Sequence, residues 1–127
     1  MPIHTLEYTA VPDSRSGASW SVSQEADAEE ARDIVLSAYG STTVALAFDK
    51  DNLKMIYVYS VNQMTLGFGL LGGGTKNIAL KGGRPFVWHS DDQHANPFTA
   101  DVIDLDVSNG LGWEVTLYVR VLHDSTP

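Results

Sequence analysis

Residues 113–122, WEVTLYVRVL, decide the fold class of this chain. Apolar side chains recur there at every second position, which is the period of a β-strand with one buried face. These positions are Trp113, Val115, Leu117, Val119 and Val121. Glu114, Thr116 and Arg120 fall on the opposite face. The alternation therefore predicts a strand that packs against a core, with Trp113 on its inner face.

The rest of the chain repeats this pattern in short segments separated by turn residues. We expect strands near residues 3–11, 19–23, 43–48, 53–61, 64–71, 77–81, 85–88, 102–107 and 113–122. Residues 49–52, DKDN, are interpreted as a hairpin loop between two of them. Short strands joined by turns favour antiparallel pairing. We predict a single domain over residues 1–127, mainly β, built as an antiparallel sandwich or barrel of seven to nine strands.

One early segment has the period of a helix instead. Asp27 followed by Glu30 matches an N-terminal capping pattern, and Ala28, Ala31 and Val35 recur at helical spacing. We therefore expect one α-helix at about residues 27–39, which would place the fold at the margin of the α+β class.

Composition excludes several partners and chemistries. The chain has 16 acidic residues against 8 basic ones, a formal net charge of −8, and its basic residues are scattered singly. No nucleic acid is expected as a partner, and anionic membrane surfaces are disfavoured for the same electrostatic reason. The absence of cysteine excludes disulfides, thiol catalysis and cysteine-bound zinc.

The sequence does not reveal a compartment. Its first residues, MPIHTLEYTAVPDS, lack the basic start and long apolar run of a signal peptide. No apolar stretch reaches the roughly 20 residues that a transmembrane helix needs. The localisation is therefore unknown, and cytoplasmic by default.

The richest cluster of chemical groups is residues 88–98, WHSDDQHANPF. Imidazole and carboxylate groups suit a metal ion, but His89 and His94 are five residues apart and converge on no regular element. A catalytic role for Ser90 is not supported, because Ser90 does not lie in a G-x-S-x-G sequence, the nucleophile elbow of many serine hydrolases. Whether these histidines bind a metal is left open, and no cofactor is expected.

A binding loop is the interpretation that we favour for this segment. Sugar recognition needs aromatic faces together with carboxylate or amide groups. The candidate ligand-binding residues are Trp88, His89, Asp91, Asp92, His94 and Asn96. Trp20 and Trp113 could extend the surface if they are exposed. In the alternative, Trp88 and Phe98 anchor the ends of a solvated loop in the core.

A second feature is the glycine-rich segment 65–74, TLGFGLLGGG. Its glycines could form a flexible apolar hairpin that inserts into a membrane. We favour a structural role, in which the bare strand face accommodates the early helix. Tyr57 and Tyr59 share a strand face with Met55 and are expected inside the sandwich or barrel.

These observations favour a small, non-enzymatic binding module with lectin-like recognition of a carbohydrate or another neutral polar ligand. A membrane-active, toxin-like β protein that uses residues 65–74 is the first alternative. A small enzyme with a His/Asp pocket is the second. A homo-oligomer would be an ordinary means of covering an edge strand.

Overall fold

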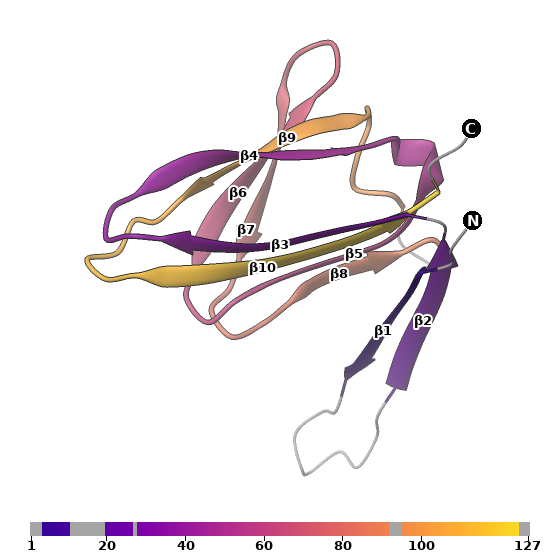
Figure 1. Cartoon of the computed structure of the whole chain (residues 1–127), viewed down its shortest axis with the longest axis horizontal. Helices are drawn as coiled ribbons and strands as arrows, with labels where there is room; N and C mark the ends of the chain where they lie inside the picture. The colour runs from indigo at the N-terminus through magenta and orange to yellow at the C-terminus, as the bar shows by residue number, and fades with distance from the viewer. Residues whose placement is uncertain (1–3, 11–19, 27, 92–94, 125–127) are drawn as a thin grey trace.

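The fold consists of two antiparallel β-sheets packed face to face, with a separate β-hairpin at one end (Figure 1). It is seen in a computed structural model that describes residues 4–10, 20–26, 28–91 and 95–124. Ten strands and one 3₁₀ turn lie in these ranges. They are β1 (His4–Ala10), β2 (Trp20–Ala26), β3 (Ala28–Leu36), β4 (Ser41–Phe48), η1 (Lys50–Asn52), β5 (Leu53–Ser60), β6 (Met64–Leu70), β7 (Thr75–Leu80), β8 (Phe86–His89), β9 (Val102–Ser108) and β10 (Val115–His123).

Eight of these strands form the sandwich. One sheet, here named the β10 sheet, has the order β3-β10-β5-β8, and the other, the β9 sheet, has the order β4-β9-β6-β7. All neighbouring strands are antiparallel. The predicted mainly β, two-layered antiparallel fold is confirmed, and most of the stretch WEVTLYVRVL forms β10, an inner strand of its sheet.

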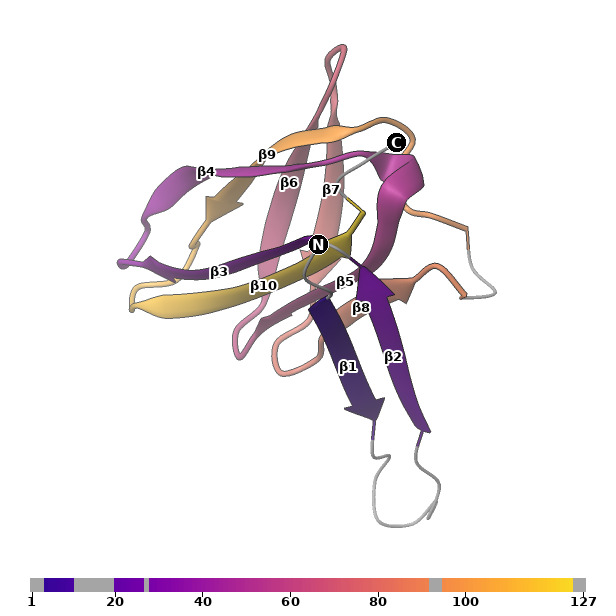
Figure 2. The same ribbon diagram turned by 45° about the vertical axis from the view of Figure 1, so that its right-hand side comes forward.

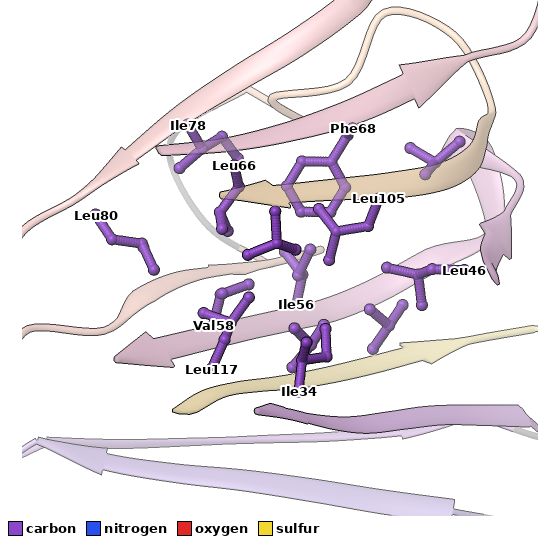
Figure 3. Packing of buried hydrophobic residues seen from close by; sticks show 14 of the residues in the cluster. Ile34, Leu46, Ile56, Val58, Leu66, Phe68, Ile78, Leu80, Leu105 and Leu117 are labelled. Carbon is purple, nitrogen blue, oxygen red and sulfur yellow. The ribbon is translucent and has the colours of Figure 1, made fainter. Parts of the chain in front are cut away.

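The core lies between the two sheets, where aliphatic side chains and Phe68 interdigitate (Figure 3). Leu117, Val119 and Val121 of β10 are fully buried there, as the alternation predicts. Trp113 differs from that prediction. The strand begins only at Val115, and Trp113 lies in the preceding loop with 58% of its surface exposed.

The predicted helix at residues 27–39 is wrong, because residues 28–36 form strand β3. This strand pairs with β10 over nine register positions, from Ala28 opposite His123 to Leu36 opposite Val115. Its burial alternates with a period of two, and Ile34 and Leu36 point into the core. Asp27, the expected cap, lies outside the described residues.

Tertiary pairing overrides the helical pattern here. Without β3, the inner strand β10 would have an unpaired edge along its full length. A polar residue of β3 also contacts the other sheet of the sandwich. The Arg32 guanidinium donates from Nε to the carbonyl oxygen of Ala45 on β4, 3.2 Å away, and pairs with Glu30 at 3.0 Å. Arg32 thus links the edge strands of the two sheets.

The predicted hairpin at residues 49–52 is also wrong. Strands β4 and β5 belong to different sheets, and the connection between them contains the 3₁₀ turn η1. Each strand buries apolar residues on its inner face, for example Phe48 on β4 and Ile56 on β5. Because the chain crosses from one sheet to the other between β4 and β5, the apolar faces of these two strands face each other across the same core. In a flat hairpin, the two strands would lie side by side in one sheet.

Tyr57 and Tyr59 lie on the outer face of the β10 sheet rather than inside the sandwich. On β5 the fully buried residues Ile56 and Val58 face the core, and the two tyrosines alternate with them. Both faces of β5 carry large apolar or aromatic side chains, so alternation alone could not show which face points into the core. The aliphatic set packs between the sheets, and the amphipathic tyrosines remain half-buried outside.

Candidate functional site

The loop that follows β8 is anchored by its two large aromatics. Trp88 is 8% exposed and Phe98 is 3% exposed, and both belong to the core between the sheets. The ring of Phe98 meets Phe48 and Phe68 edge to face, with centroids 5.3 and 5.1 Å apart. Trp88 therefore offers no open face on which a sugar ring could stack.

Asn96 holds the same loop against η1. Its amide nitrogen donates to the carbonyl oxygen of Lys50 at 2.8 Å, and its Oδ1 accepts the backbone N–H of Phe98 at 2.9 Å. The ammonium of Lys50 pairs in turn with Asp51 at 2.8 Å, and the hydrogen bond and charge of that carboxylate raise the pKa of Lys50. The amide of Asn96 is thus already used in fixing the loop.

Of the remaining predicted site residues, the described part of the chain contains His89 and Asp91. His89 is half-buried at the end of β8, opposite Met55, and Asp91 is exposed. Asp92 and His94 lie outside the described residues. No three His, Asp or Glu side chains within the described ranges are close enough to hold a metal ion. Ligand binding by this loop stays a prediction.

The glycine-rich segment 65–74 forms most of β6 and its turn to β7. Leu66 and Phe68 are fully buried in the core, Leu70 is half-buried, and Leu71 is 61% exposed. The strand face on which the glycines carry no side chain was expected to accommodate a helix. Instead, it leaves room for the carboxylate of Asp104 on β9, because a Cβ on Gly69 would collide with that carboxylate. Among the described residues, no helix is long and apolar enough to cross a membrane.

Two loops lie together at the end of the sandwich opposite the end of β8, and each carries an exposed aromatic residue (Figure 1). Tyr39, in the turn from β3 to β4, is 75% exposed, and Trp113, in the loop from β9 to β10, is 58% exposed. The two loops touch: the Tyr39 N–H donates to the Leu111 carbonyl at 2.9 Å, and a Cβ on Gly112 would lie 3.2 Å from the Tyr39 hydroxyl. We name residues 37–40 and 109–114 the aromatic tip.

A buried asparagine fixes these two loops to one another. Asn109 is 4% exposed, and its amide nitrogen donates to the carbonyl oxygens of Ser37 at 2.9 Å and Trp113 at 2.7 Å. Its Oδ1 accepts the N–H of Leu111 at 2.9 Å, and its own N–H donates to the Gly40 carbonyl at 2.8 Å. The aromatic residues therefore stand on loops held by four hydrogen bonds from one residue.

Two shallow pockets open beside the aromatic tip and meet at Ser108. The first, about 390 Å³, has a lining without a charged residue: Gln63, Met64, Thr65, Ser108, Gly110 and Leu111. The second, about 460 Å³, is lined by Ser41, Thr42, Thr43, Asp106, Val107 and Ser108. The Thr43 hydroxyl donates to Oδ1 of Asp106 at 2.5 Å. The surface next to the two exposed aromatics is thus rich in hydroxyl and amide groups.

A third depression, of about 310 Å³, contains His123 with Asp49, Asp101 and Asp124. Two of its carboxylates make contacts within the fold. Asp101 accepts the backbone N–H of Lys50 at 2.9 Å, and Asp124 lies 3.8 Å from the ammonium of Lys54. His123 Nε2 lies 3.9 Å from a Glu30 carboxylate oxygen. The geometry favours a structural role for these contacts.

Sequence reasoning named Trp113 as a possible extension of a binding surface, but it did not bring Trp113 and Tyr39 together, because it assigned both to regular elements. Tyr39 fell at the end of the predicted helix, and Trp113 at the start of the predicted strand. The signal that was available is the run SNGLG at residues 108–112, since its glycines end the strand pattern before Trp113.

These features define the class of structure: an eight-stranded β-sandwich with a candidate binding surface on its loops. The chain matches no known protein family, and it shows no significant similarity to a curated protein sequence or to a solved structure.

Proposed function

We propose that this chain is a small, non-enzymatic binding module that recognises a carbohydrate, or another neutral polar ligand, at the aromatic tip. The observation that carries the proposal is the pair of exposed aromatics, Tyr39 and Trp113, held on loops fixed by buried Asn109. Large exposed aromatics on a rigid support lose little conformational entropy on binding.

The surroundings of the pair support a neutral ligand. The apolar face of a sugar ring packs on aromatic rings, and its hydroxyls need donors and acceptors nearby. The first of the two adjoining pockets, whose lining has no charged residue, offers the Gln63 amide and the hydroxyls of Thr65 and Ser108. An uncharged lining suits an uncharged ligand, because it leaves no buried charge without a partner.

The loop that follows β8 remains a second proposed contact, through His89, Asp91, Asp92, His94 or Asn96. The described residues of this loop lie at the other end of the sandwich from the aromatic tip (Figure 1), so a small ligand cannot touch both. Variants can therefore distinguish the two locations. The membrane-active alternative is less well supported, because Leu66 and Phe68 fill the core.

The test is glycan-array binding by the full chain and its Trp113→Ala and Tyr39→Ala variants. Each loss of stacking should weaken binding about fivefold, because an aromatic contact of this kind contributes about 1 kcal/mol. Leu71→Ala is the matched control, since Leu71 is equally exposed but lies on the β6–β7 turn. Thermal unfolding shows that each variant is folded.

Retained binding by both tip variants, with loss on Asp91→Ala, would move the site to the loop that follows β8. No binding to any saccharide would count against a lectin-like function. Turnover of a saccharide during the assay would favour the small-enzyme alternative.

A further inference from the structure

The two sides of the sandwich differ in their edge strands. On one side, β3 and β4 are linked, because Arg32 of β3 donates to the carbonyl oxygen of Ala45 on β4. On the other side the edge strands are β7 and β8, and within the described residues no hydrogen bond joins them. The described strands of the β1–β2 hairpin lie on the far side of the β10 sheet from β7 (Figures 1 and 2). No described strand therefore covers the outer edge of β7.

The backbone of β7 presents hydrogen-bonding groups along this edge. Leu70 donates its N–H to the Gly74 carbonyl at 3.2 Å, and the antiparallel register of β6 and β7 continues from this bonded pair. Bonded and non-bonded pairs alternate in such a ladder, so Thr75, Asn77 and Ala79 direct their N–H and C=O groups away from β6. An edge of this kind can accept a further strand.

Positive charge is concentrated on the same side of the molecule. Residues 52–90 contain four of the eight basic residues and no acidic one, although the whole chain has a net charge of −8. Three of the four make no ion pair within the described residues: Lys76 on β7, and Lys81 and Arg84 just after it. The charge of these three side chains is available to a partner.

A pocket of about 250 Å³ lies where β7 ends. Its lining combines apolar with cationic side chains: Ala79, Leu80, Lys81, Arg84, Pro85 and Phe86. The turn that carries the two cations is fixed, because Arg84 donates its N–H to the Lys81 carbonyl at 3.1 Å and Gly83 donates to the Ser60 carbonyl at 2.9 Å. The pocket therefore suits an apolar side chain whose neighbours along the chain are carboxylates.

We propose that the outer edge of β7 and this pocket bind an extended acidic peptide of another protein, which adds to the β9 sheet as a fifth strand. Charge complementarity selects this occupant, because its carboxylates would pair with Lys81 and Arg84. The acidic residues in the strands of the β9 sheet are Asp104 and Asp106 of β9, and β6 separates them from β7.

The register of β7 specifies how the peptide lies. Peptide residues opposite Thr75, Asn77 and Ala79 donate to β7, and their side chains share the outer face of the sheet. The residues between them lie opposite Ile78 and Leu80, which are buried, and they point toward the core side and the pocket. Acidic residues therefore suit the first set and apolar residues the second.

A second copy of the chain fits this edge less well. Pairing of two β7 edges would bring the unpaired cations of both copies together without a carboxylate between them. Lysine on an edge strand is a common device against such pairing. An acidic peptide meets the same cations with the opposite charge.

Fluorescence anisotropy tests the proposal with a labelled peptide of alternating Glu and Val that has the six-residue length of β7. The full chain should bind it, and the affinity should fall as NaCl is added, because salt screens the ion pairs. The double variant Lys81→Gln, Arg84→Gln should weaken binding about tenfold, since each exposed ion pair contributes up to about fivefold. Lys54→Gln is the matched control and should change binding by less than about twofold, because Lys54 already pairs with Asp124.

Modified peptides distinguish strand addition from charge attraction alone. N-methylation of the Glu residues removes the N–H groups that face β7 and should weaken binding at least about tenfold, whereas N-methylation of the Val residues should have little effect. Hydrogen exchange of the Thr75, Asn77 and Ala79 amides should slow when the unmodified peptide binds.

No binding of the unmodified peptide, equal effects of the two methylations, or unchanged exchange at these amides would overturn the proposal. Unchanged affinity of the double variant would also contradict it. Sedimentation velocity of the chain without peptide should show no dimer that the double variant dissociates, because such a dimer would assign the edge to a second copy instead.

Discussion

Asn109 shows how one side chain can set the geometry of a surface. An asparagine amide buried without partners would be costly, but here both its donor and its acceptor are bonded to the loops that carry Tyr39 and Trp113. The sequence indicates a turn at residues 108–110, and it does not indicate that the amide reaches Ser37, because that contact depends on how β3 and β9 are placed.

Replacing Asn109 with alanine should therefore destabilise the fold and loosen the aromatic tip. The loss leaves the carbonyl oxygens of Ser37 and Trp113 without this donor, and we expect about 3 kcal/mol less stability in urea unfolding. Asn77→Ala, at an exposed position of β7, is the matched control and should change stability by less than about 0.5 kcal/mol. Equal effects of the two substitutions would show that Asn109 does not hold the loops.

At the scale of elements, the strands with clean alternation were predictable and the ambiguous segments were not. Most of β9 and β10 lies where the period of two places it, although β10 begins only at Val115 and Ile103 of β9 is 48% exposed. Residues 28–36 satisfy both the helical and the strand period, and only the unpaired edge of β10 decides between them. The connection of β4 to β5 was misjudged for a related reason, since local sequence shows a turn but not which sheet each strand joins.

One connection between the sheets requires a residue without a side chain, namely Gly82. This glycine lies in the turn from β7 to β8, where a Cβ would lie 2.7 Å from the backbone oxygen of Val61 and 3.2 Å from the N–H nitrogen of Gln63. Gly82→Ala should cost about 2 kcal/mol of stability, because backbone atoms on both sides must move. Gly110→Ala meets no atom within 4 Å and should be nearly neutral. Thermal unfolding of both variants measures the difference, and equal midpoints would refute this packing.

At the scale of the whole molecule, the two ends of the sandwich differ in character. One end carries the exposed aromatics beside an uncharged pocket, and the other carries the anchored loop that follows β8, with acidic groups around His123. The sequence pointed to aromatic and amide groups as a binding chemistry, which stays a prediction, and Trp113 was among the residues it could place on a binding surface. It could not show that Trp88 is buried while Trp113 is exposed, because that depends on where each strand ends.

The most direct test of the proposed binding site is a two-dimensional NMR titration of the full chain with the saccharide selected on the array. Binding at the aromatic tip predicts shifts of the Trp113 indole N–H and of the backbone amides of Tyr39, Gly110 and Gly112, while Ser90 and Asp91 stay unchanged. Shifts confined to residues 89–96, with the Trp113 indole unmoved, would contradict the account.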